Sequence, residues 1–198
     1  MKKEELNDLV IGRKYKVKSK EWFEKNNIDD FHYRKAVAYD YTDKKMVLWE
    51  IVNGDTLVLG NSWKYNDGYV WLKRDAVDEI HNQKKPSKEI INAIKKLKKE
   101  KYIYGYDGGP GGGSGGTINT EEEHILPVFE EDGSEAIYLN VSSCKRTFTL
   151  EKIKELFKTG KTEQSFRATE WTTIRTELKL IKDKTKLPER SSWETMRD

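Results

Sequence analysis

The chain has 198 residues and a formal net charge of +3, with 36% charged and 35% hydrophobic residues. This length accommodates one large domain or two small ones, each with a modest core. The longest apolar runs, such as Met46-Val47-Leu48-Trp49, are too short to cross a bilayer, and acidic residues near the start argue against a signal peptide. Because Cys144 is the single cysteine, no internal disulfide can form, and we expect a cytoplasmic protein.

Residues 1–83 are predicted to form a small β domain. Tyr15 and Val17 alternate with lysines, and residues 37–41 alternate in the same way, which predicts two short strands. Strands at 46–52 and 55–59 are joined by Asn53-Gly54, a pair typical of a type I′ hairpin turn. A second hairpin is predicted from 62–65 and 69–72, and a helical turn from Glu21–Lys25. Strands this short usually close on themselves, so we expect a small SH3-like or otherwise partly open barrel.

Residues 84–104 are predicted to form a basic amphipathic helix. Ser87 is placed as its N-cap, and Ile90, Ile94 and Leu97 form one apolar stripe with Ile91 beside it. Residues 84–101 contain eight lysines against two glutamates, so this segment carries the positive charge of a chain that is otherwise slightly acidic.

Residues 105–117 are predicted to be a glycine-rich linker or loop. Eight of the fourteen glycines fall within residues 105–116, a segment with no aliphatic side chain that could pack into a core. The run also has the glycines of a phosphate-binding loop, but it lacks the lysine that such loops require. We therefore expect two separate parts on either side of it.

Residues 118–198 are predicted to form a small α+β domain with a polar tail. Segments 124–129 and 135–141 flank Asp132-Gly133, which indicates a hairpin. Thr149 then caps a helix that ends at Gly160. Residues 171–181 fit either a helix or a strand, and their threonines favour a strand. The predicted fold class is α+β throughout.

Three stretches carry a resemblance to known proteins: Leu9 to Val17, Ser19 to Phe23, and Gly68 to Leu72. Together they resemble small bacteriophage accessory proteins, which begin with a similar Gly-Lys-Lys-Tyr-x-Val strand and a glutamate-containing turn. Those proteins resemble compact β barrels. The resemblance covers residues 9–75 and implies a phage protein in the host cytoplasm, where such proteins bind and disable host enzymes or defence systems. It implies no catalytic residue.

The residues that could bind metals or do chemistry are scattered. His32, His81 and His124 lie far apart, and no pair has metal-ligand spacing. Cys144 has no histidine beside it in the sequence, and the acidic pairs Asp29-Asp30 and Glu130-Glu131 fall in predicted turns. We therefore expect no metal, no cofactor and no enzymatic activity.

Two sets of residues are candidates for binding a macromolecule. The first is a group of aromatic side chains for a protein partner: Trp22, Trp49, Trp63, Tyr65, Tyr69 and Trp71. The second is the lysine face of the helix for nucleic acid: Lys88, Lys95, Lys98 and Lys99. We expect a protein-binding module that engages a bacterial host protein. The alternatives are a nucleic-acid-binding protein and a minor virion component.

Overall fold

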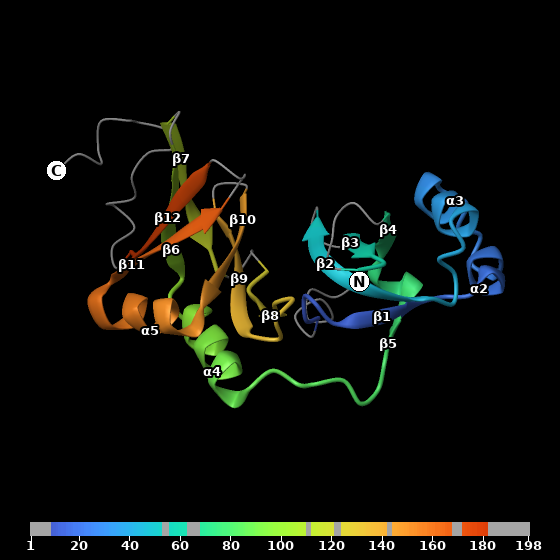
Figure 1. Ribbon diagram of the computed structural model, residues 1–198, viewed down its shortest axis with the longest axis horizontal. Coiled ribbons are helices and arrows are strands. Elements are labelled where there is room, and N and C mark those ends of the chain that lie inside the picture. Colours follow the sequence, from blue (N-terminus) through green and yellow to red (C-terminus); the bar gives the residue numbers. More distant parts are fainter. Residues whose placement is uncertain are drawn as a thin grey trace. The chain divides into compact units, whose positions relative to one another are not determined.

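The computed structural model describes residues 9–52, 56–62, 68–109, 112–120, 124–141, 144–167 and 172–181 (Figure 1). The chain divides into two compact units. The first contains Met1–Pro86 and Val128–Ser134, and the second contains Ser87–Pro127 and Glu135–Asp198. The fold is α+β, as predicted, with antiparallel strand pairs in three sheets.

The first unit is built on a five-stranded antiparallel sheet in the order β4-β3-β2-β1-β5. Its strands are β1 (Lys14–Val17), β2 (Lys45–Val52), β3 (Thr56–Gly60), β4 (Tyr69–Lys73) and β5 (Val77–Glu79), with the 3₁₀ helix η1 (Arg74–Ala76) before β5. The predicted β2–β3 hairpin is confirmed by the pairing of Leu48 with Leu59 and of Val52 with Thr56, although its turn lies outside the described residues.

Two helices of the first unit lie between β1 and β2 in the sequence. Helix α2 (Lys20–Lys25) confirms the predicted helical turn, and the side chain of Ser19 caps it by accepting a hydrogen bond from the Trp22 N–H. Helix α3 (Phe31–Ala38) begins at Asp30, whose carboxylate accepts from the Tyr33 N–H at 2.7 Å. Its buried residues are Tyr33 and Ala36.

The prediction of an SH3-like barrel is wrong, because none of the described sheets closes on itself. The strand predicted at residues 37–41 is instead the end of α3 and the turn after it. Helix α3 packs against the edge strand β4, which protects that edge without barrel closure. Of the second predicted hairpin, the later strand forms as β4, which pairs with β3, and residues 63–65 of the other arm lie outside the described residues.

A short return segment completes the first unit. Ile11 forms an isolated parallel bridge with Val128, and the Phe129 N–H donates to the Ile11 carbonyl at 2.9 Å. The turn that follows is closed by hydrogen bonds between Glu130 and both Gly133 and Ser134, and Gly133 has a φ of +80°. The predicted hairpin turn at Asp132-Gly133 is therefore confirmed.

The second unit contains a four-stranded antiparallel sheet in the order β11-β12-β6-β7. These strands are β6 (Tyr102–Gly109), β7 (Gly112–Asn119), β11 (Lys161–Arg167) and β12 (Thr173–Leu180). A three-stranded sheet, in the order β10-β9-β8, contains β8 (Leu126–Phe129), β9 (Glu135–Val141) and β10 (Cys144–Thr149). Strand β12 confirms the choice of a strand in the ambiguous segment, within the residues that are described.

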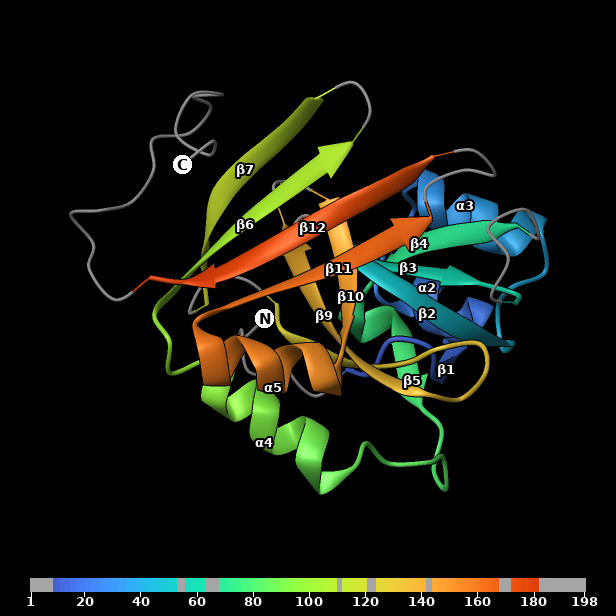
Figure 2. The same ribbon diagram turned by 60° about the vertical axis from the view of Figure 1, so that its left-hand side comes forward.

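Helices α4 (Lys88–Leu97) and α5 (Leu150–Thr159) lie side by side (Figure 2). Both agree with the sequence: the hydroxyls of Ser87 and Thr149 cap them, and Gly160 ends α5 with a φ of +83°. Their apolar stripes join one core with side chains from the strands, including Ile103, Ile118, Ile137, Leu139, Val141, Phe148 and Leu178. Local capping and helical periodicity were sufficient to predict both helices.

The prediction of a glycine-rich linker at 105–117 is wrong, since the described residues of this run form β6 and β7. Residues other than the glycines supply the side chains of this core, and the glycines allow neighbouring side chains to come close. Gly105 lies so close to Val141 that a Cβ there would be 2.6 Å from the valine Cγ1. The rings of Tyr104 and Tyr106 lie across Gly115 and Gly113 of the neighbouring strand. Aromatic rings thus cover the glycines of an edge strand.

Candidate aromatic interaction surface

The large hydrophobic side chains that are exposed in the described part of the chain gather on the first unit. Phe31 is 72% exposed, Tyr39 63% and Tyr69 36%. Phe31 begins α3 and Tyr39 follows its last residue, while Tyr69 begins β4, the strand against which α3 packs. Exposed apolar groups that cluster on one face, and are not scattered singly, mark an interaction surface.

Helix α3 divides its side chains between the core and this surface. Phe31, Lys35 and Tyr39 are spaced four residues apart, so they follow one side of the helix. Tyr33 and Ala36 point into the unit, where the Tyr33 ring stacks on Phe23 at 4.7 Å. The helix and its C-cap therefore present the rings of Phe31 and Tyr39, while the buried side chains of Tyr33 and Ala36 anchor the helix in the unit.

Ring contacts join α3 to β4. The His32 ring stacks on Trp71 with a centroid distance of 5.5 Å and an interplanar angle of 17°, and Phe31 meets His32 edge-on at 5.4 Å. The Lys35 ammonium lies 4.2 Å from the centroid of the Tyr69 ring. We call the set of Phe31, His32, Lys35, Tyr39, Tyr69 and Trp71 the aromatic surface.

A ring stack just past the C-terminal end of α3 lies beside the residue that precedes β4. Tyr39 stacks on Tyr41 at 5.7 Å, and a Cβ at Gly68 would collide with the Tyr41 hydroxyl. Gly68 has a φ of +80°, a conformation that favours glycine, and it immediately precedes β4. The exposed Tyr39 is thus positioned by a buried tyrosine beside the strand that carries Tyr69.

Charges border the aromatic surface. Arg34 donates two hydrogen bonds to Asp29, at 2.9 and 3.0 Å, and this hydrogen bonding holds the pKa of Asp29 below its ordinary value. Lys44 pairs with Asp40 at 3.3 Å. Both ion pairs are exposed, so they shape the rim of the surface and add little to stability.

The six aromatic residues singled out from the sequence have different environments. Tyr69 and Trp71 belong to the aromatic surface. Trp49 is only 7% exposed and packs over Gly60, with its indole N–H donating to the Ser62 carbonyl at 2.5 Å, so we leave it out. Trp22 lies half-buried on α2 against Phe23. Trp63 and Tyr65 lie outside the described residues.

Four members of the aromatic surface were missed by sequence reasoning: Phe31, His32, Lys35 and Tyr39. The alternation of Val37, Tyr39 and Tyr41 indicated a strand. A strand in this segment left no reason to look for a helix over the residues before it. A signal was present, because Asp30 stands where a helix N-cap belongs.

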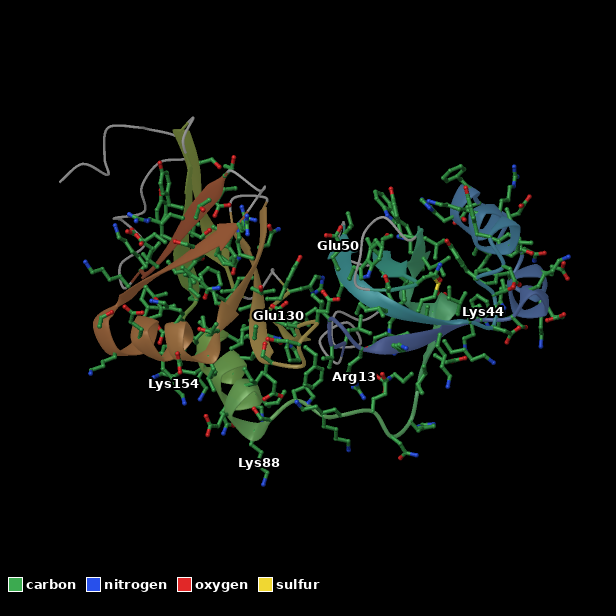
Figure 3. The ribbon with its side chains drawn as sticks, in the orientation of Figure 1. Arg13, Lys44, Glu50, Lys88, Glu130 and Lys154 are labelled. Carbon is green, nitrogen blue, oxygen red and sulfur yellow. The ribbon has the colours of Figure 1, made fainter. Side chains whose placement is uncertain are left out.

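The lysines predicted for nucleic acid lie in the second unit, on α4 or within two residues of its C-terminal end. Lys88, Lys95 and Lys99 are exposed, and Figure 3 shows Lys88 projecting away from the helix. Lys98 is half-buried at the C-cap. Two other contacts tie α4 to α5: Lys154 pairs with Glu89 at 3.0 Å, and the Lys96 ammonium lies 4.0 Å from the Phe157 ring centroid.

Metal-binding clusters and membrane-spanning helices are absent from the described part of the chain. Within those residues, no three His, Cys, Asp or Glu side chains gather as a metal site would require. No described helix is long and apolar enough to span a bilayer. Comparison with protein families, curated proteins and solved structures found no match.

Proposed function

We propose that this protein is a non-enzymatic binding module that engages a bacterial host protein through the aromatic surface of its first unit. The observation that supports this is the gathering of Phe31, Tyr39 and Tyr69 on one helix and its neighbouring strand. Aromatic side chains are enriched in protein interfaces and dominate their binding energy. They offer a large contact area with few rotatable bonds.

The arrangement has the form of an interface centre with a polar rim. The rings of His32 and Trp71 are already stacked, so they lose little conformational entropy when a partner binds. The exposed ion pairs Arg34–Asp29 and Lys44–Asp40 lie on or beside α3 and can stay hydrated. Binding energy is expected from the rings, with the charges setting the orientation.

The test is affinity capture from a bacterial lysate with matched variants, followed by binding measurements with the purified captured protein. Phe31→Ser with Tyr39→Ser should weaken binding by about 30-fold or more, the effect of losing about 2 kcal/mol at an interface centre. The control replaces Lys88, Lys95 and Lys99 by glutamine and should bind like the unchanged protein. Equal binding by both variants would contradict the proposal.

A second candidate function, nucleic-acid binding, is favoured by the exposure of Lys88 and Lys95 on α4 and of Lys99 in the turn that follows it. If these lysines neutralise phosphates, affinity for DNA or RNA falls steeply with salt, and the glutamine variant flattens that dependence. A captured species that is sensitive to nuclease, lost in the glutamine variant and retained by the Phe31→Ser and Tyr39→Ser protein would establish this alternative.

A further inference from the structure

Strand β7 forms one edge of the four-stranded sheet in the second unit, and β6 is the described strand that pairs with it. From Gly112 to Asn119 this strand has no charged residue and no proline. The opposite edge, β11, exposes Lys161, Glu163 and Arg167. Charges and prolines are the usual protection of a sheet edge against pairing with another chain. One edge of the sheet is protected in this way and the other is not.

Two tyrosine side chains extend from β6 across β7 toward this edge. A Cβ at Gly115 would lie 2.8 Å from Cζ of Tyr104 and even closer to its hydroxyl. A Cβ at Gly113 would lie 2.5 Å from Cζ of Tyr106, again with the hydroxyl closer. Each phenol group therefore occupies the place where the side chain of an edge residue would stand.

Only 8% of Tyr104 is exposed, and its hydroxyl lies over Gly115 of the edge strand. Burial raises the pKa of Tyr104, with smaller contributions from Tyr106 and Glu177. The hydroxyls of Tyr104 and Tyr106 therefore offer hydrogen-bonding groups beside an edge strand that has no charged residue and no proline.

We propose that β7 accepts an extended segment of a partner protein as a fifth strand, with oxygen- or nitrogen-bearing side chains placed beside Gly113 and Gly115. Opposed residues on neighbouring antiparallel strands have Cβ atoms about 4.5–5.5 Å apart. Because the two hydroxyls stand near the missing Cβ positions, such side chains come within hydrogen-bonding reach of Tyr106 and Tyr104. Main-chain hydrogen bonds supply the affinity, and the tyrosines select the side chains.

A short linear segment fits this edge better than a second copy of the chain. Eight residues extend about 27 Å, and a strip of that length and about 10 Å in thickness has an area of about 270 Å². A stable interface buries about 800 Å² on each partner. This proposal concerns the second unit and does not depend on the function proposed for the first.

The experiment selects peptides from a random twelve-residue library against the full chain and measures the affinity of the synthesised products. Each peptide is then remade with single N-methyl groups along its backbone. In a paired strand every other N–H faces the neighbour, so N-methylation should weaken binding at alternate positions, by about tenfold where a hydrogen bond of about 1.4 kcal/mol is lost. Selected sequences should carry polar residues two apart.

Three variants of the protein separate strand addition from other modes of binding. Ser114→Lys places a charge on β7 and should lower affinity by about tenfold or more, while Ser165→Lys places the same charge on β11 and should leave it unchanged. Tyr104→Phe, which removes only the hydroxyl, should lower affinity several-fold without changing the thermal melt. Absence of alternation in the N-methyl series, or equal effects of the two lysine variants, would overturn the proposal. So would self-association that Ser114→Lys abolishes, or selected peptides that bind through Phe31 and Tyr39.

Discussion

The buried ion pair between Asp107 and Arg146 offers the sharpest test of the second unit. The Arg146 side chain of β10 donates to both carboxylate oxygens of Asp107 on β6, at 3.0 and 3.3 Å. The Thr176 hydroxyl of β12 donates to the same carboxylate. Only 7% of the Asp107 side chain and 16% of the Arg146 side chain are exposed. We predict that Asp107→Ala is strongly destabilising.

The size of the effect follows from burial. Asp107→Ala removes the bidentate carboxylate partner of Arg146 and the acceptor of the Thr176 hydroxyl, and loss of one member of a buried pair costs about 3–5 kcal/mol. Arg175 and Glu163 in the same sheet form a matched control, with the same chemistry and a distance of 3.0 Å, but with 68% and 44% of their side chains exposed. Glu163→Ala should therefore cost less than about 1 kcal/mol.

The assay is urea unfolding of the full chain, followed by circular dichroism, for both single variants. A third protein, with Asp107→Leu and Arg146→Met together, should recover most of the lost stability, because apolar replacement of a buried pair is often neutral or favourable. If Asp107→Ala and Glu163→Ala lower the free energy of unfolding equally, the burial argument fails.

Two further predictions concern other positions. Gly105→Ala should destabilise the protein by about 1–3 kcal/mol in urea unfolding, because its Cβ would press on Val141, whereas Gly109→Ala, with its nearest atom 3.8 Å away, should cost less. The pKa of Asp29, lowered by Arg34, should rise in Arg34→Gln when followed by NMR. Since that pKa is lowered in the folded state, the stability it contributes is present at neutral pH and is lost as the pH falls through it.

The aromatic surface shows how much of a binding surface can be predicted from the identity of the side chains alone. The sequence pointed to Tyr69 and Trp71 because aromatic residues were too numerous for two small cores. It also pointed to Trp49, which the structure buries over Gly60, a residue eleven positions away that is brought close by the pairing of β2 with β3. Exposure depends on what covers a ring, and that is decided by strands and helices elsewhere in the chain.

The sequence alone determined the elements whose signals are local. Helices α4 and α5 follow from Ser87, Thr149 and Gly160 together with an apolar stripe, and Asn53-Gly54 predicted the joining of β2 and β3. These signals act within a few residues, through capping, helical periodicity and turn geometry.

The tertiary structure alone decided the segments that lack an apolar pattern of their own. The glycine run becomes β6 and β7 because Tyr104 and Tyr106 cover Gly115 and Gly113, and because Gly105 admits Val141. Glycine favours no secondary structure by itself, so its state depends on which side chains come to lie against it. Those contacts form only when strands distant in the sequence pair, and a single-sequence pattern carries no record of that pairing.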